Sequence, residues 1–231
     1  MIAALLFWLY FIIDDFMTES IEVLINSENK GDRIKALNLI RALEPAIAFG
    51  YIKQLVVDNN TRVRYAAVSQ LATLGSHDLA ETFIILRDRL VNDPEPDVQA
   101  AAADSIGALK LTDAFDDLQN LYETTPEWLV QFSIIAALGE LGDPRGLKLL
   151  QTALTNETSL VQTAAIGAIG ELGNPSGIES LIPFVTNPDW QIRYQLARSL
   201  RNLGGDLAAQ SLAILATDPV EQVAKEAQGI G

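Results

Sequence analysis

The chain has 231 residues, of which 49% are hydrophobic, and its formal net charge is −14. This acidic excess argues against sequence-independent nucleic-acid binding and against binding to anionic membranes, because both need clustered Lys and Arg. The sequence contains no cysteine, which excludes disulfides, thiolate nucleophiles and thiolate metal sites and agrees with a cytoplasmic location.

Residues 1–16 form an apolar N-terminal extension that is interrupted only from Asp14 onward. The run is shorter than the about 20 apolar residues that a membrane span needs. It also lacks the basic leading region and the small-residue cleavage site of a secretory signal. We interpret it as an upstream extension that results from start-site choice, with a weak membrane-association helix as the alternative. The residues from Met17 onward (M-T-E-S) look like the ordinary start of a cytoplasmic protein.

From residue 17 onward the sequence predicts a single solenoid, because one segment recurs at a nearly fixed interval. The β-branched residue that opens each copy advances in steps of 35, 32, 31, 31 and 31 residues. Each unit carries two apolar helical segments, such as 146–154 and 160–172. We therefore predict an all-α, right-handed solenoid of about six to seven helix pairs. The opening residues, called anchors below, are Val63, Val98, Val130, Val161, Ile192 and Val223.

The two ends of the solenoid depart from the repeat pattern. We predict an N-terminal cap unit at 17–44, regular repeats at 45–204 and a C-terminal cap unit at 205–231, because the end units of a solenoid must present a polar outer face. Units of this length leave no room for an inserted catalytic domain.

A column of short polar residues precedes the second helix of each unit, five residues before the anchor. Such side chains accept hydrogen bonds from the free amides of a helix start, so we predict a capping role. Only the fourth unit differs, with Thr125 at this position. The other members are Asp58, Asp93, Asn156, Asn187 and Asp218.

The second helices are rich in small residues and include Gly167 and Gly170. Glycine inside a helix costs about 1 kcal/mol relative to alanine, so its repeated use predicts close backbone approach between neighbouring second helices. These helices are expected to line the concave face. Trp128 and Trp190 share the position two residues before their anchors, and we predict that they fill the groove between second helices.

The position after each of the first five anchors is polar, and an aromatic residue follows it in three of these units. One explanation is structural: an arginine there hydrogen-bonds the capping residue of an adjacent unit. The other is functional: the arginines attract a partner or an acidic ligand, and the aromatic rings stack beside it. The candidate binding residues on the concave face are Arg64, Tyr65, Gln99, Gln131, Phe132, Gln162, Arg193, Tyr194, Arg198 and Arg201.

The sequence predicts no catalytic residues and no metal site. His77 is the sole histidine and lies in a predicted turn, and no G-x-x-x-x-G-K-[S/T] phosphate-binding loop is present. The pattern favours binding over bond chemistry.

Several segments resemble the short HEAT-like repeats of the phycobilin lyase superfamily. Residues 189–193 (D-W-Q-I-R), followed by Ala197 and Leu200, are similar to that repeat, as are 128–130 with 139–142 (G-E-L-G). Residues 31–37 (G-D-R-I-K-A-L) and 63–71 (V-R-Y-A-A-V-S-Q-L) more narrowly resemble cyanobacterial phycobilisome degradation proteins. The resemblance begins near residue 29 and reaches the C-terminus.

The resemblance implies a HEAT-type solenoid that acts as a non-catalytic accessory protein. It would bind phycobiliprotein subunits and promote phycobilisome disassembly or degradation under nutrient stress. One alternative is a bilin lyase subunit, which attaches or detaches phycocyanobilin together with a second HEAT-repeat chain. Another is a general scaffold for protein interactions. Because the chain has no cysteine, any phycobilin would be held without a thioether bond.

Overall fold

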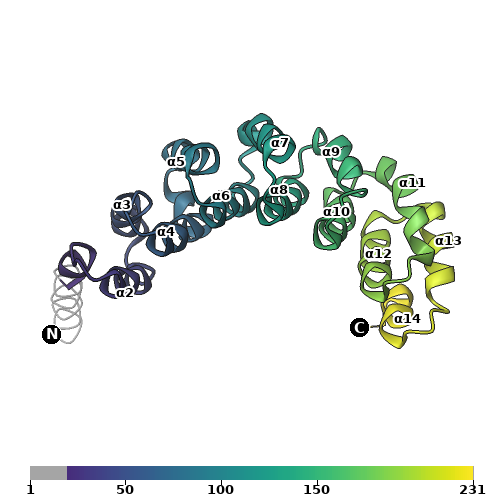
Figure 1. Cartoon of the computed structure of the whole chain (residues 1–231). Coiled ribbons are helices and arrows are strands. Elements are labelled where there is room, and N and C mark those ends of the chain that lie inside the picture. The colour runs from purple at the N-terminus through teal and green to yellow at the C-terminus, as the bar shows by residue number, and fades with distance from the viewer. Residues whose placement is uncertain (1–19, 231) are drawn as a thin grey trace, which may run out of the picture.

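The computed structural model describes residues 20–230, in which two rows of helices form a curved array (Figure 1). The helices of this range are α-helical or 3-10, and none of its residues forms a strand, so the predicted all-α solenoid is confirmed here. The extension at residues 1–16 lies outside the described residues.

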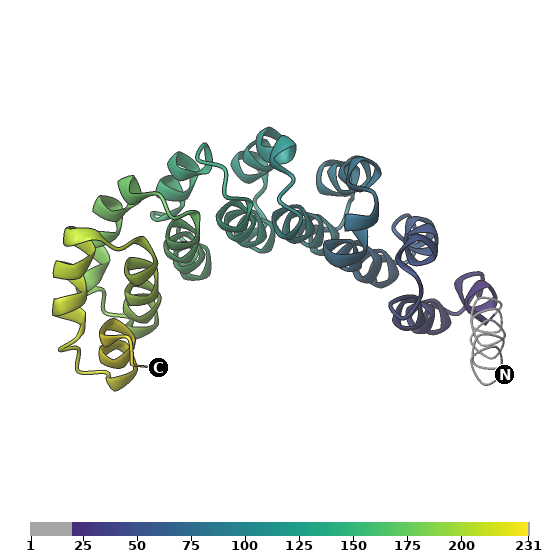
Figure 2. The same ribbon diagram turned by 180° about the vertical axis from the view of Figure 1, so that it is seen from behind.

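The outer, convex row consists of every second helix (Figures 1 and 2). Its members are α3 (Pro45–Leu55), α5 (Leu79–Asn92), α7 (Phe115–Thr124), α9 (Gly146–Ala153), α11 (Ile178–Leu181) and α13 (Gly205–Leu215). The inner, concave row contains α2 (Lys30–Ile40), α4 (Thr61–Leu74), α6 (Pro96–Ala108), α8 (Trp128–Leu141), α10 (Ser159–Leu172), α12 (Trp190–Leu203) and α14 (Glu221–Gln228). No helix in the described range is long and apolar enough to span a membrane.

Six consecutive outer–inner pairs run from α3 to α14, and α2 and the helical residues 20–25 precede them. Short 3-10 segments at Gly75–His77, Thr112–Ala114 and Pro175–Gly177 lead into outer helices. The outer helix of the fifth pair is short, because α11 passes into a 3-10 segment at Ile182–Thr186. Pro183 lies at this junction and has no N–H with which to continue the α-helical hydrogen bonding. The predicted cap-unit boundaries stay a prediction.

The hydrophobic core lies between the two rows. All six anchors are buried within it, and only Ile192 retains measurable exposure, at 4%. Two inner helices end at glycine: Gly142 and Gly173 have left-handed backbone angles, with φ of 71° and 67°. Because glycine has no Cβ, it adopts this conformation without strain and ends α8 and α10.

Neighbouring inner helices approach each other at small residues. A Cβ atom added to Gly107 would lie 2.7 Å from the Cα atom of Ala137, and one added to Gly139 would lie 2.7 Å from the Cα atom of Ala168. Gly170 has the same relation to Ser199. The predicted close backbone approach is confirmed at these three crossings, whereas a Cβ on Gly167 would meet only the side chain of Gln195.

The column of short polar residues makes a turn rather than the helix cap itself. Each side-chain oxygen accepts a hydrogen bond from the backbone N–H two residues later, for example from Asn60 to Asp58 at 2.7 Å and from Glu95 to Asp93 at 3.1 Å. Thr125 does the same with Glu127 at 3.2 Å. The predicted hydrogen bond from these side chains to the first turn of the inner helix is therefore wrong. Instead, the side chains stabilise the turn that immediately precedes each inner helix. We call them the turn column.

Candidate functional site

Three arginines that follow an anchor, or its equivalent in the first unit, make the same set of hydrogen bonds. Each guanidinium donates two hydrogen bonds to the turn-column aspartate of the next unit and one to a backbone carbonyl six residues earlier in the chain. The paired distances are 2.6 and 3.0 Å for Arg33 and Asp58, 2.9 and 3.0 Å for Arg64 and Asp93, and 2.6 and 2.9 Å for Arg193 and Asp218. The carbonyl distances are 2.7, 2.8 and 2.6 Å.

Neutral side chains take these positions in the middle of the array. Gln131 donates to the carbonyl of Thr125 at 3.0 Å and accepts from the side-chain amide of Asn156 at 3.1 Å. Gln162 donates to the carbonyl of Leu154 at 2.6 Å, and Gln99 is half-buried at the equivalent position. We call this series, from Arg33 to Arg193, the ladder. Arginine is followed by an aspartate in the next unit's turn, and glutamine by Asn or Thr.

These bonds are the ones that the structural explanation of the arginines predicts. Arg64 is only 8% exposed, and its pKa is raised chiefly by the hydrogen bonds to Asp93. The pKa of Arg193 is raised in the same way by Asp218. Both guanidinium groups therefore join adjacent units, and a direct contribution of either to partner binding stays a prediction.

Acid should weaken the last unit through the ladder. Hydrogen bonds from Arg193 lower the pKa of Asp218, so this carboxylate stabilises the fold above its unfolded pKa of about 3.9, and the stabilisation is lost as the pH falls through the lower folded pKa. We expect Asp218→Asn to reduce the free energy of unfolding by about 1–3 kcal/mol at pH 7 and by progressively less below pH 4. Urea unfolding between pH 7 and pH 3 measures this difference.

Asp206→Asn, an exposed substitution in α13, is the matched control and should unfold like the native chain throughout this range. A difference between Asp218→Asn and the native chain that stays constant down to pH 3 would contradict this account.

The remaining candidate residues separate into three groups. Phe132 and Tyr194 are half-buried and pack against the core. Arg201 bonds to Glu226 of α14 at 3.0 Å and so holds the last inner helices together. Tyr65 and Arg198 are exposed, and Arg198 has no ion pair within 4.0 Å among residues 20–230.

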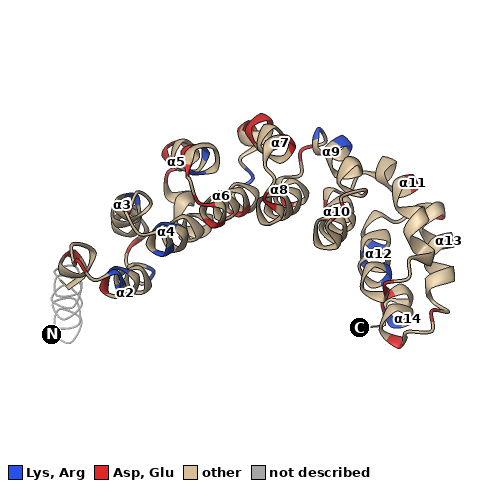
Figure 3. Cartoon of the chain, in the orientation of Figure 1, with Lys and Arg blue, Asp and Glu red and all other residues tan. Residues whose placement is uncertain are grey.

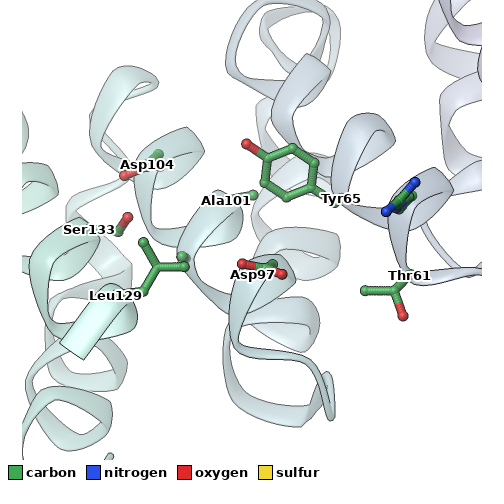
Figure 4. Close-up of a pocket in the computed structure, with 9 residues that line it drawn as sticks. Thr61, Tyr65, Asp97, Ala101, Asp104, Leu129 and Ser133 are labelled. Atoms are coloured by element: carbon green, nitrogen blue, oxygen red, sulfur yellow. The ribbon is translucent and has the colours of Figure 1, made fainter. Parts of the chain in front are cut away.

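Tyr65 forms one wall of a pocket of about 340 Å³ at the concave face, where α4, α6 and α8 meet (Figure 4). Its side chain is 47% exposed. Figure 4 shows its hydroxyl turned toward the side on which Asp104 lies, with Leu129 and Ser133 of α8 beyond. The pocket is lined by Thr61, Arg62, Tyr65, Asp97, Ala100, Ala101, Asp104, Leu129 and Ser133.

Among residues 20–230, Asp104 forms no ion pair within 4.0 Å. Its side chain reaches solvent, but the concave wall surrounds it closely enough that desolvation raises its pKa. The negative charge of Glu140 raises this pKa further, and a hydrogen bond with Ser133 opposes both effects. The ionised carboxylate is therefore incompletely compensated by the chain.

The middle of the inner row is acidic. Helices α6, α8 and α10 carry Asp97, Asp104, Glu140 and Glu171 and contain no Lys or Arg (Figure 3). Burial raises the pKa of Glu171, the charge of Glu140 adds to this, and Arg198 opposes it from α12. Glu140 and Glu171 both reach solvent near the ends of their helices.

The two tryptophans do not fill a groove between inner helices. Trp128 and Trp190 are the first residues of α8 and α12, and they are 46% and 41% exposed. At these exposures the two indole rings are not enclosed between inner helices, which corrects the packing prediction. Leu160, the second residue of α10, is also exposed, at 52%.

In the described residues, no group of three or more His, Cys, Asp or Glu side chains is arranged to hold a metal ion. His77 is exposed, in a 3-10 turn, and its ring centroid lies 5.8 Å from that of Phe49. The pocket, the acidic inner row and Arg198 are the candidate binding surface. Sequence reasoning missed Asp97 and Asp104 because they lie outside the aligned positions after the anchors.

Comparison with known proteins gives one family match. The family of HEAT repeats matches residues 83–168 and 149–230. Among solved structures, the complex of CpcE and CpcF of phycocyanin lyase from a Nostoc species has a TM-score of 0.61 and 21% identity, covering 93% of this chain and 94% of that chain. A search of curated protein sequences found no match.

Two further structures share the fold. The YibA protein of E. coli has a TM-score of 0.62 and 14% identity over 95% of this chain and 85% of its own. An engineered protein has a TM-score of 0.62 and 19% identity over 91% of this chain and 66% of its own. At these identities the likeness concerns the fold.

Proposed function

The chain belongs to the HEAT-repeat family, and we propose that it is a non-catalytic accessory protein that binds phycobiliproteins. By binding them it promotes the disassembly or degradation of phycobilisomes under nutrient stress. Residues 31–37 and 63–71 support this proposal through their resemblance to the phycobilisome degradation protein NblB. The fold similarity to a chain of the CpcE and CpcF complex of phycocyanin lyase adds support.

The observation that carries the proposal is the open concave surface from α4 to α12. It combines an exposed tyrosine pocket at one end, an acidic middle and the exposed cation Arg198 at the other end. Four helix steps of about 8–10 Å separate α4 from α12, so the surface spans about 30–40 Å. That length suits a protein surface, and one open-chain tetrapyrrole would touch only one end of it, without a covalent bond to cysteine.

The test is to mix the purified protein with holo-phycocyanin and with its apo-subunits. Size-exclusion chromatography with light scattering reports the complex, and bilin absorbance and covalent bilin content report on the chromophore. We expect a stoichiometric complex with holo-phycocyanin, altered bilin absorbance and no turnover. Absence of a complex with either form would overturn the proposal and leave a general protein scaffold.

A substitution at the surface sharpens this test. Arg198→Ala should weaken phycocyanin binding by about fivefold at low salt and less at high salt, because an exposed interface charge acts mainly through screened attraction. Its melting temperature should be unchanged, since Arg198 has no ion pair among the described residues. Lys148→Ala on the outer helix α9 removes the same charge from an exposed position and should bind like the native chain.

A bilin lyase subunit is the second candidate function. The likeness to the complex of CpcE and CpcF favours it, because that complex pairs two chains of phycocyanin lyase. A lyase role would require a second HEAT-repeat chain as partner. It predicts repeated attachment or detachment of bilin in the same mixture, which a binding protein does not produce.

A further inference from the structure

We propose that the pocket between α4, α6 and α8 accepts an arginine side chain presented by a partner protein. This inference rests on the proposed function in one respect: both take the concave surface as the place where a protein partner binds. It names the chemistry of one contact on that surface.

The charges around the pocket favour a cationic guest. Asp97 and Asp104 line it, Arg62 is the sole basic residue among the lining side chains, and α8 on the far side contributes no cation. The pKa of Asp104 is raised because its ionised carboxylate is partly desolvated and is repelled by the negative charge of Glu140. A guanidinium beside Asp104 would supply the missing positive charge, whereas an acidic guest would add to the repulsion.

The shape of the pocket favours an extended side chain over a metal ion. Asp97 and Asp104 are seven residues apart on α6, which places them about 10 Å apart along the helix axis. One ion therefore cannot be coordinated by both carboxylates. The volume of about 340 Å³ equals that of about ten water molecules, which leaves room for a guanidinium and its methylene stem.

Tyr65 makes arginine a better guest than lysine. The tyrosine is half exposed at the pocket wall, and the floor beside it consists of Ala100 and Ala101. A planar guanidinium stacks on an aromatic face while it donates to a carboxylate, and it is more weakly hydrated than an ammonium group. The alanines and Leu129 offer an apolar track for the stem.

The experiment uses the full chain and three synthetic heptapeptides that differ only at the central residue, which is arginine, lysine or its neutral analogue citrulline. Amide NMR spectra recorded during titration report both affinity and location. We expect the arginine peptide to shift the amides of Ala100, Ala101 and Ser133, and to bind at least about fivefold more tightly than the citrulline peptide. The lysine peptide should lie between them.

Two substitutions locate the contact. Tyr65→Ala and Asp104→Asn should each weaken binding of the arginine peptide by about fivefold. Asp116→Asn makes the same charge change on the outer helix α7, where the side chain is 82% exposed, and should leave binding unchanged. Circular dichroism checks that all three variants retain their helical content.

The inference would be overturned if the arginine and citrulline peptides bound equally, or if neither bound at millimolar concentration. It would also be overturned if the amide shifts were confined to other residues, or if Asp104→Asn bound the arginine peptide as tightly as the native chain. The titration contains no phycobiliprotein. Its failure therefore leaves the proposed function standing, and a missing phycocyanin complex leaves a positive peptide result standing.

Discussion

Asp93→Ala should lower the free energy of unfolding by about 3–5 kcal/mol, because breaking a buried ion pair leaves its other member uncompensated. The carboxylate of Asp93 is fully buried and accepts from Arg64 at 2.9 and 3.0 Å, from Arg89 at 3.1 Å and from the backbone of Glu95 at 3.1 Å. The substitution removes all four hydrogen bonds and leaves the buried guanidinium of Arg64 without a carboxylate partner. Urea unfolding followed by circular dichroism measures the loss.

Asp116→Ala is the control for this prediction, since its exposed carboxylate should contribute no more than about 1 kcal/mol. The double variant Arg64→Ala with Asp93→Ala should lose less stability than the sum of the two single variants, because no Arg64 guanidinium then remains without its carboxylate partner. If Asp93→Ala unfolds at the same urea concentration as the native chain, the ladder does not hold the units together.

Gly139→Ala should also destabilise the chain, by about 1–3 kcal/mol, although alanine is the better helix former. The added Cβ atom would lie 2.7 Å from the Cα atom and 2.9 Å from the Cβ atom of Ala168 on the next inner helix. Backbone cannot move aside as a flexible side chain does, so α8 and α10 must separate. Thermal and urea unfolding measure the effect.

Gly50→Ala is the matched comparison. Gly50 lies inside α3, and a Cβ atom there would meet nothing within 4 Å. This variant should be more stable than the native chain by about 0.5–1 kcal/mol, since only the helix-propensity effect remains. Similar effects of the two substitutions, in either direction, would show that close helix contact does not decide the outcome at Gly139.

The repeat period predicts the architecture because it depends on the local spacing of apolar residues. The anchors lie in the core, as one repeat unit alone suggests. The short α11 shows the limit of this reasoning: Pro183 was visible in the sequence, but the periodic pattern concealed its effect.

The candidate site was less predictable because it depends on how units stack. The sequence predicts that Arg64 bonds the short polar residue of an adjacent unit, and the structure identifies that residue as Asp93, 29 residues later. The sequence does contain a signal for this pairing. Where the position after the anchor is arginine, the turn column of the next unit has aspartate, and where it is glutamine, the next turn has Asn or Thr. Tyr65 and Asp104 come from different inner helices, so their shared pocket follows from helix spacing, which no local pattern contains.

The ladder has charged members at both ends and neutral members in the middle, so its units are not interchangeable. If the unit that carries Asp93 followed the one that carries Gln131, the buried carboxylate of Asp93 would face a neutral amide in place of the guanidinium of Arg64. If the Asn156 unit followed Arg64, a buried guanidinium would lose its anion. Units of similar shape therefore differ in the polar side chains that join them. This difference destabilises arrangements in which the repeats are shuffled or shifted by one unit, and so favours their native order.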